Sequence, residues 1–466
     1  MQTLVIAGAT GFVGRWFIDR YRDDYHIIAL SRSAMQPDSD GTTGRNPVEW
    51  RQVEMYSITS VTQAVTGADY ALYLVHSMEP NTRLHQGSFE DMDLLLADNF
   101  ARAAEKVGLR QIVFMGGILP HENLDELSRH LRSRYEVEMA LGATGVPVTA
   151  LRAGIIVGPG GSSFLMIKRL IERLPVLLCP EWTRNHTQPI ALQDALRIIE
   201  YCLGRESTFS RSIDIGGSEV TTYMGMMVTT NELMGKNRII RPVPFFSAGL
   251  SKMWVSLFTG YSQELTSPLV ESLRHRMVAD DNDVLAAFPD RMDFRQAAAI
   301  TLRDADKSAP VPRRLPDERE KNTVRSVQRL PNPMNRSAPW VARMYQAWLP
   351  RFFRYLIRVE SDEEYSTFSL FGIPLLKLHF IAQRSDNDRQ LFYVIDGELV
   401  KRSDYGWLEF RRVLNGRYVI TAIHEFVPAL PWYVYVLTQA RAHRFVMNSF
   451  GKFLGRRDGE EGGHQK

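Results

Sequence analysis

The chain has 466 residues, of which 44% are hydrophobic and 23% charged, a composition typical of a globular protein with two or more domains. Its formal net charge of +3 is too small for this length to indicate a nucleic-acid partner. With only two cysteines, Cys179 and Cys202, a disulfide scaffold and a cysteine-rich metal site are excluded. No apolar run is long enough for a membrane-spanning helix and no secretory leader is evident, so we expect a cytoplasmic protein.

A glycine-rich turn follows the first apolar run. Gly8, Gly11 and Gly14 are spaced three apart between an expected strand and an expected helix. Such a turn binds the pyrophosphate of a dinucleotide, because free backbone N–H groups and the positive helix end face the phosphates. Gly8 permits the tight turn, Gly11 lets the backbone approach the phosphates, and Gly14 lets the helix lie close to the strand. The expected cofactor contacts in this turn are Gly8, Thr10, Gly11, Phe12, Val13 and Gly14.

Strand-like and helix-like segments alternate through the first third of the chain. The expected strands are Thr3–Ala7, His26–Ser31, Glu49–Met55, Tyr70–Val75, Gln111–Met115 and Val148–Val157. The expected helices are Asp91–Val107, Leu127–Leu141, Phe164–Leu174 and Gln193–Leu203. This alternation predicts a doubly wound α/β fold, a parallel sheet with helices on both faces. With a small substrate subdomain, we expect this domain to cover residues 1–302.

The character of the sequence changes after residue 302. Prolines and dense charge with little apolar periodicity predict an exposed linker over residues 303–338. A C-terminal α+β domain is expected over 339–455, followed by a disordered tail at 456–466. Its expected strands are Ser366–Phe371, Leu375–Ala382, Gln390–Ile395, Leu408–Leu414 and Arg417–Phe426, and a long helix is expected at Trp432–Leu454.

The expected closing helix at Trp432–Leu454 admits two interpretations. Its aromatic face and its arginines, among them Arg441 and Arg444, would suit peripheral contact with a membrane interface. Alternatively, the apolar face closes over the preceding strands as core, which is the interpretation we favour. If the strands curl around the helix, the domain would be helix-grip-like, with an apolar ligand cavity.

The end of the second expected strand bears on the choice of cofactor. An acid at this place hydrogen-bonds the adenine ribose in NAD sites, but here the strand ends in Ser31 and Arg32. An arginine suits the 2′-phosphate of NADP through its charge and its paired donors. We therefore favour NADP, with NAD as the alternative if Arg32 is an ordinary surface residue.

Several stretches follow one another in an order that resembles a known family. They are GATGFVG at 8–14, LYLVHSM at 72–78, NFARAAEKVGLRQIVFMGG at 99–117, SRYEVEMAL at 133–141, VPVTALRAGIIVGPG at 146–160, QPIALQDAL at 188–196, DIGGSEVTTY at 214–223 and GKNRIIRPVP at 235–244. Together they resemble the atypical and extended short-chain dehydrogenase/reductases, specifically the NmrA-like branch of NAD(P)-binding proteins. GWLEF at 406–410 and the segment 431–450 resemble an uncharacterised domain that follows this unit in some bacterial members.

The resemblance implies further cofactor contacts. Glu54 stands where the family places an acid against the adenine, and Leu74, Val75 and His76 would line the adenosine and the nicotinamide ribose. The stretch 154–156 would pack beside the nicotinamide. The other ligand implied is a small-molecule substrate, which the sequence does not identify.

The chain departs from the family at each catalytic position. Family catalysis uses a serine, then a tyrosine that supplies a proton and a lysine that lowers its pKa. Here Gly116 and Gly117 replace the serine, His130 aligns with the tyrosine, and Arg134 aligns with the lysine. Two hypotheses remain open. Either His130 or His76 is an alternative acid while Arg134 holds the ribose, making the protein an oxidoreductase, or the protein binds the dinucleotide without turnover, as a regulator or assembly factor.

No metal site is predicted. His121–Glu122 and His424–Glu425 each lack a second histidine at ligand spacing, so we expect them to be ordinary surface residues.

Overall fold

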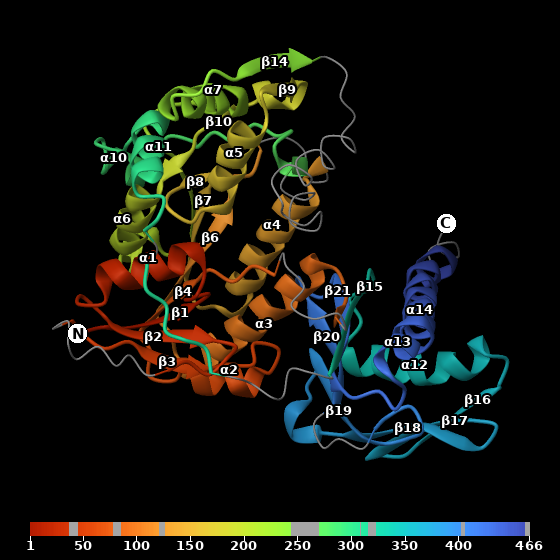
Figure 1. Ribbon diagram of the computed structural model, residues 1–466. Coiled ribbons are helices and arrows are strands. Elements are labelled where there is room, and N and C mark those ends of the chain that lie inside the picture. The colour runs from red at the N-terminus through yellow and green to blue at the C-terminus, as the bar shows by residue number, and fades with distance from the viewer. Residues whose placement is uncertain are drawn as a thin grey trace. The chain divides into compact units, whose positions relative to one another are not determined.

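The computed structural model divides into two compact units (Figure 1). The N-terminal unit comprises residues 1–79 and 99–316, and the C-terminal unit comprises 80–98 and 317–466. The division falls within helix α3 (Phe89–Val107). The residues that the structure describes are 1–36, 45–77, 85–120, 126–243, 270–307, 309–315, 323–401 and 406–461.

A seven-stranded parallel sheet forms the centre of the N-terminal unit. Its order is β12-β7-β6-β4-β1-β2-β3, so the chain changes direction across the sheet between β1 and β4. The strands are β1 (Thr3–Ala7), β2 (His26–Ser31), β3 (Glu49–Gln52), β4 (Tyr70–Tyr73), β6 (Gln111–Gly117), β7 (Val148–Ala153) and β12 (Arg211–Ile215). In doubly wound folds the ligand binds at the carboxyl ends of the strands beside such a switch point. The predicted doubly wound α/β fold is confirmed.

Helices cover this sheet on both faces (Figure 1). The principal ones are α1 (Phe12–Tyr21), α2 (Ile58–Val65), the second part of α3, α4 (Arg129–Leu141) and α6 (Leu192–Cys202). Apolar residues fill both faces of the central strands, because helices pack against each side; Leu4, Ile6, Leu72 and Val113 are fully buried.

Smaller elements beyond β7 build a subdomain at the carboxyl ends of the strands. It contains α5 (Ser162–Arg173), α7 (Tyr223–Leu233), α10 (Asp283–Ala286), α11 (Phe294–Arg303) and the short strands β8 (Ile156–Val157), β9 (Val176–Pro180), β10 (His186–Thr187), β11 (Ile190–Ala191), β13 (Thr221–Thr222) and β14 (Ile239–Val243). Phe164, Ile171, Met226 and Phe294 form its core.

The C-terminal unit contains an eight-stranded sheet of order β16-β17-β18-β19-β20-β21-β15-β5, antiparallel except for the pairing of β15 with β5. Its strands are β5 (His85–Gln86), β15 (Val324–Pro331), β16 (Ile357–Ser361), β17 (Tyr365–Leu370), β18 (Ile373–Phe380), β19 (Arg389–Asp396), β20 (Trp407–Val413) and β21 (Tyr418–Phe426). Helices α12 (Ala338–Phe352), α13 (Trp432–Leu437) and α14 (Gln439–Glu461) complete the unit.

The closing helix packs its apolar face as core, the interpretation favoured from the sequence. Met447, Phe450 and Leu454 are buried with Trp348 and Phe410 in one cluster. The expected single helix is two, because the backbone leaves the helical region at Thr438, with φ −116° and ψ −82°. Of the helices in the described ranges, none is long and apolar enough to cross a membrane.

Three expectations about the chain's organisation were wrong. Residues 303–338 are not a free linker, because β15 pairs with β21 and buries Val324, Val327 and Leu330. Residues 80–98 group with the C-terminal unit although they lie within the domain expected over 1–302. The expected disordered tail is helical as far as Glu461, where α14 ends.

Candidate functional site

The glycine turn joins β1 to α1 at the switch point of the sheet. Gly8 has φ +90°, and a Cβ there would lie 2.9 Å from the carbonyl carbon of Leu74. A Cβ on Gly14 would lie 2.5 Å from the carbonyl oxygen of Gly8. Both separations are too short for a side chain, so the turn requires glycine at these two positions.

The turn has the features of a phosphate cradle. Gly11 caps α1 without a side-chain hydrogen bond, and the first turn of the helix carries no acid. The first backbone N–H groups of a helix have no partner within that helix, so they and the positive end of α1 are suited to a phosphate. Thr10, Phe12 and Val13 are half-buried in this turn. The residues present therefore fit the pyrophosphate of a dinucleotide.

The end of β4 lies beside the glycine turn. The backbone N–H of Leu74 donates to the carbonyl oxygen of Ala7 at 2.8 Å. The carbonyl oxygen of Val75 accepts a hydrogen bond from Arg134 Nη1 at 3.2 Å. His76 follows, half-buried. The structure thus places Leu74 next to Gly8.

The residues expected at the adenosine end follow β2 and β3. Leu30 pairs with Ala7, so Ser31 and Arg32 come directly beside the start of the glycine turn. Ser31 is buried and Arg32 is exposed. A carboxylate oxygen of Glu54 accepts from the backbone N–H of Tyr56 at 3.1 Å, so this side chain also stabilises its own turn.

Two histidines far apart in the sequence meet at the other end of the site. His76 Nε2 lies 3.2 Å from His130 Nδ1, within hydrogen-bonding distance. The side chain of Arg134 is buried, and its guanidinium lies over the ring of Phe114 at 5.1 Å while bonding Val75. Arg134 therefore fixes the end of β4 from helix α4. We named these residues individually from the sequence, but no local pattern predicted that the two histidines pair.

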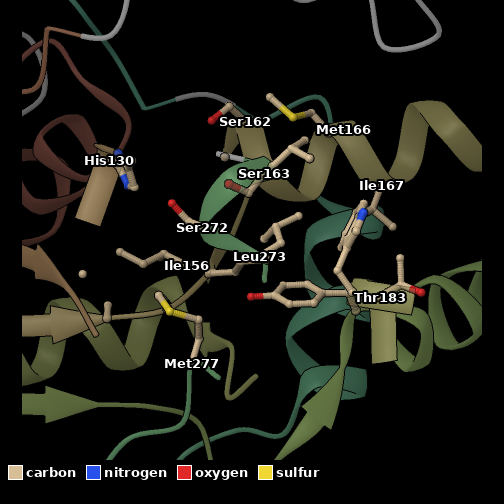
Figure 2. A pocket seen from close by; sticks show the side chains of 18 of the residues that line it. His130, Ile156, Ser162, Ser163, Met166, Ile167, Thr183, Ser272, Leu273 and Met277 are labelled. Atoms are coloured by element: carbon tan, nitrogen blue, oxygen red, sulfur yellow. The ribbon is translucent and has the colours of Figure 1, made fainter. Parts of the chain in front are cut away.

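A cavity of about 290 Å³ opens beside His130. Gly116, Gly117 and the stretch 154–156 line it, together with Phe12 from the glycine turn. The remaining lining comes largely from apolar residues of the subdomain, which include Met166, Ile167, Leu170, Leu178, Trp182, Met227, Leu273 and Met277. Figure 2 shows Ile156, Leu273 and Met277 along the cavity, with His130 and Thr183 at opposite sides of the view.

Sequence reasoning missed most of this apolar lining. The amphipathic pattern of α5 is the one signal that bears on Met166 and Ile167, but it marks core residues in the same way. The cavity also contains a phenol and a thiol, Tyr223 and Cys179. Burial raises the pKa of Tyr223 to about 12 and that of Cys179 to about 11, so both are protonated at neutral pH.

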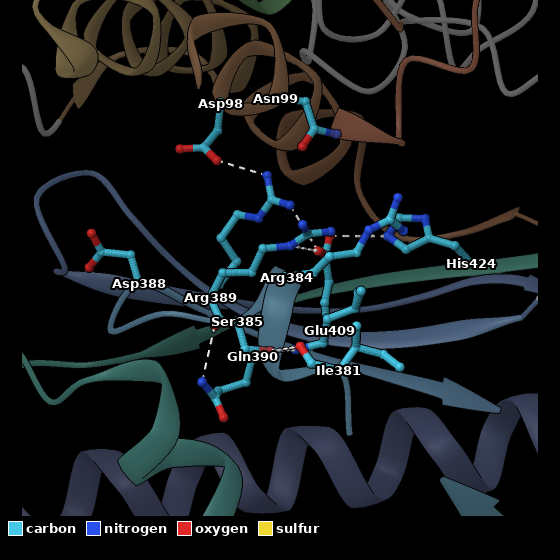
Figure 3. Close-up of polar contacts among 12 residues, drawn as sticks. Asp98, Asn99, Ile381, Arg384, Ser385, Asp388, Arg389, Gln390, Glu409 and His424 are labelled. Carbon is cyan, nitrogen blue, oxygen red and sulfur yellow. Dashed lines mark hydrogen bonds and ion pairs between the residues drawn. The ribbon is translucent and has the colours of Figure 1, made fainter. Parts of the chain in front are cut away.

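A second polar centre lies in the C-terminal unit (Figure 3). Glu409 Oε2 accepts from Arg389 and Arg411, each at 2.8 Å, and Arg411 also donates to Asp98 at 2.9 Å. His424 Nε2 lies 3.3 Å from Glu409 Oε1. Burial would raise the pKa of Glu409, but Arg411 and Arg389 outweigh it and hold that pKa well below its usual range.

The expectation that His424 is a surface residue was wrong. Its side chain is fully buried, in contact with Glu409 and stacked on Trp407 at 4.8 Å. The other histidine pair considered for a metal, His121–Glu122, lies outside the described residues.

Comparison with known proteins agrees with this geometry. Residues 8–165 match the family of NAD(P)H-binding domains. The crystal structure of a nucleoside-diphosphate-sugar epimerase from Staphylococcus aureus is 16% identical, with a TM-score of 0.51 over 64% of this chain and 100% of that chain. The triphenylmethane reductase of Citrobacter sp., solved with NADP(H), is 16% identical, with a TM-score of 0.50 over 66% of this chain and 100% of that chain. At these identities, the likeness shows the fold.

A curated relative matches over a shorter region. The auxiliary protein GraX of Staphylococcus aureus is 26% identical over 147 residues, which are 31% of this chain and 42% of that protein. The chain therefore matches less than half the length of this relative.

The fold and the glycine turn define the class: the N-terminal unit is an NAD(P)-binding α/β domain. More particularly, its residues 8–165 match the NAD(P)H-binding family, and the solved epimerase and reductase share the fold of this unit.

Proposed function

We propose that the protein is a cytoplasmic NADP-linked reductase of an apolar small molecule. The observation that carries this proposal is the cavity of about 290 Å³, apolar in most of its lining, that opens beside the glycine turn and His130. Its position at the carboxyl ends of the strands is where such folds hold their reactive ligand. When bound, the reduced nicotinamide would supply a hydride to the substrate.

The cofactor would be held mainly by backbone. The N–H groups at the start of α1 would bind the pyrophosphate, and Glu54 and residues 74–76 would contact the adenosine and the ribose. Arg32 supports NADP, because its exposed guanidinium at the end of β2 has no ion-pair partner within the described part of the chain.

His130 would supply the proton that the reduction requires. If His76 Nε2 donates its proton to His130 Nδ1, the proton of His130 is carried on Nε2, where it can be donated to a substrate oxygen in the cavity. His76 would then act through His130 by fixing its tautomer and orientation. Arg134 would be a positioning residue, since its guanidinium already bonds Val75.

Consumption of NADPH tests this proposal. The full chain would be assayed against a panel of hydrophobic quinones, aldehydes and ketones. We expect turnover with at least one acceptor, and a higher KM in Met166→Trp, which reduces the cavity. Val228→Trp, an exposed residue outside the lining, is the matched control and should behave as wild type. Saturable NADPH binding without consumption against the whole panel would contradict the reductase assignment.

A non-catalytic role is the second candidate. The absence of the family's serine, tyrosine and lysine favours it, as does the similarity to an auxiliary protein, GraX. In that case the cofactor would stabilise or switch the protein and would not be consumed. NADPH-dependent protection against thermal unfolding, without turnover, would be its signature.

A further inference from the structure

Two neighbouring turns of the C-terminal unit expose large hydrophobic side chains. The first turn, residues 353–356, links α12 to β16, and the second, Phe371–Gly372, links β17 to β18. Ile357 pairs with Leu370, and Leu370 pairs with Ile373. The start of β16 therefore lies directly beside the tip of the β17–β18 hairpin, and the two turns share one end of the sheet.

The two most exposed large hydrophobic residues of the described chain, Phe371 and Tyr355, lie on these turns. Phe371 is 77% exposed and Tyr355 is 74% exposed, and Ile373 and Leu356 are each more than half exposed. Single hydrophobic residues on a surface are ordinary, but four together on adjoining turns indicate an interaction site. We call this group of four the apolar tip.

The backbone of the apolar tip is unfavourable for its own side chains. Phe371 has φ +50° and Tyr355 has φ +65°, and Arg354 before it has φ +50°. A two-residue hairpin with positive φ at both positions favours Asn-Gly, whereas here the sequence is Phe-Gly. Bulky residues in the left-handed region are genuine outliers that concentrate at functional positions. Asn at either position would be more favourable for the stability of the fold.

Exposed arginines are concentrated beside the first turn of the apolar tip. Arg351, Arg354 and Arg358 are exposed along the chain on either side of Tyr355. Within the described ranges neither Arg351 nor Arg354 has an ion-pair partner, and Arg358 makes one exposed contact of 3.7 Å with Glu360. Asp362, Glu363 and Glu364 follow at the opposite end of β16, whereas Glu398 is exposed near Ile373, its backbone N–H donating to the carbonyl oxygen of Pro374 at 3.0 Å.

The aromatic surface continues onto α14. The ring of Phe445, which is 63% exposed, lies 5.9 Å from that of Phe352, and Phe352 in turn contacts Phe353 at 5.1 Å. Arg441 and Arg444 are exposed on the same helix. The sequence suggested membrane contact through the closing helix, but α14 buries Met447 and Phe450 as core. The apolar tip is therefore the better candidate for membrane contact.

We propose that the apolar tip inserts into the surface of an anionic lipid bilayer, with Arg351, Arg354 and Arg358 contacting the headgroups. Exposed aromatic and aliphatic side chains ringed by arginines match the apolar and anionic layers of such a surface. A second copy of the chain fits less well, since a two-fold interface would place the same unpaired arginines against one another.

Flotation of the full chain with vesicles tests the proposal. We expect binding to vesicles of phosphatidylcholine with phosphatidylglycerol, weaker binding to phosphatidylcholine alone, and loss of binding at high salt. The variant Tyr355→Asn/Phe371→Asn should lose binding while its melting temperature stays the same or rises, because Asn tolerates positive φ. Arg351→Gln and Arg354→Asn should each weaken binding roughly fivefold.

The matched control is Ile239→Thr, which changes a residue that is 52% exposed in the N-terminal unit and should float as wild type does. Failure of the wild type to bind anionic vesicles would overturn the proposal, as would unchanged flotation of the double Asn variant. If the wild type does not bind vesicles, and light scattering shows that it is a dimer while the double Asn variant is a monomer, the apolar tip would be a self-association surface instead.

Discussion

The glycine turn is built from backbone, whereas the cavity beside it is built from side chains. The turn depends on Gly8 and Gly14, where any Cβ would collide with the main chain. The cavity is lined by His130, which lies within hydrogen-bonding distance of His76, and by apolar residues from α5, α7 and the loops between them. A backbone site therefore leaves a compact local pattern in the sequence, and a side-chain site leaves scattered residues.

The ion cluster around Glu409 resembles the cavity in that it is built from side chains that are scattered along the sequence. Its partners Asp98, Arg389, Arg411 and His424 come from four separate elements. In the sequence, each of these residues resembles an ordinary surface charge. They are buried only because the fold brings them into contact with one another.

Replacing His130 should have the largest effect. Because His130→Gln removes the proposed proton donor, we expect kcat to fall by roughly 10²–10⁴-fold while the Kd for NADPH stays unchanged. Stopped-flow NADPH oxidation and fluorescence titration measure the two quantities. His186→Gln, an exposed histidine that does not line the cavity, is the control. Equal kcat in His130→Gln and wild type would remove His130 from the reaction.

Glu409→Gln should destabilise the C-terminal unit by about 3–5 kcal/mol, because it leaves two buried arginines without a full counter-charge. Chemical unfolding measures this loss. The folded-state pKa of Glu409 is lowered, so its stabilising contribution is complete above the unfolded-state pKa and is lost as pH falls through the folded-state pKa. Exposed Glu360→Gln is the control, and a similar small change in both variants would show that the ion cluster contributes little.

Gly14→Ala tests whether NADPH binding depends on the close backbone packing of the glycine turn. The added Cβ would lie 2.5 Å from the Gly8 oxygen and displace α1, which we expect to cost about 1–3 kcal/mol, or roughly 10- to 100-fold in NADPH affinity. Gly142→Ala is matched, since nothing lies within 4 Å of its Cβ. Unchanged NADPH affinity in Gly14→Ala would mean that the turn does not hold the phosphates.

Arg32→Asp should change the choice between the two cofactors. Loss of a charge-assisted contact costs about 1.5–3 kcal/mol, so we expect the preference for NADP over NAD to fall by roughly tenfold or more. Parallel titrations with NADPH and NADH give the ratio, and Arg20→Asp on α1 controls for net charge. An unchanged ratio of the NADPH and NADH affinities would show that Arg32 is an ordinary surface residue that does not contact the cofactor.

The sequence allowed the parallel fold and the glycine turn between β1 and α1 to be predicted, because both follow local patterns. The strand from Val324 to Pro331 escaped prediction, since prolines and charge surround it and its burial depends on pairing with β21. His424 was taken for a surface residue because nothing near it in sequence indicates Glu409. His76 and His130 are both candidates from the sequence, but their contact joins positions that lie 54 apart along the chain and depends on the fold between them.

A crystal structure of the full chain with NADP bound would test the central claim most directly. That claim is that the backbone cradle delivers the nicotinamide to an apolar cavity where His130 supplies the proton. We expect the reactive carbon of the nicotinamide to face the cavity beside residues 154–156, with His130 on the same side. A nicotinamide ring directed away from the cavity, or His130 turned away from it, would contradict this claim.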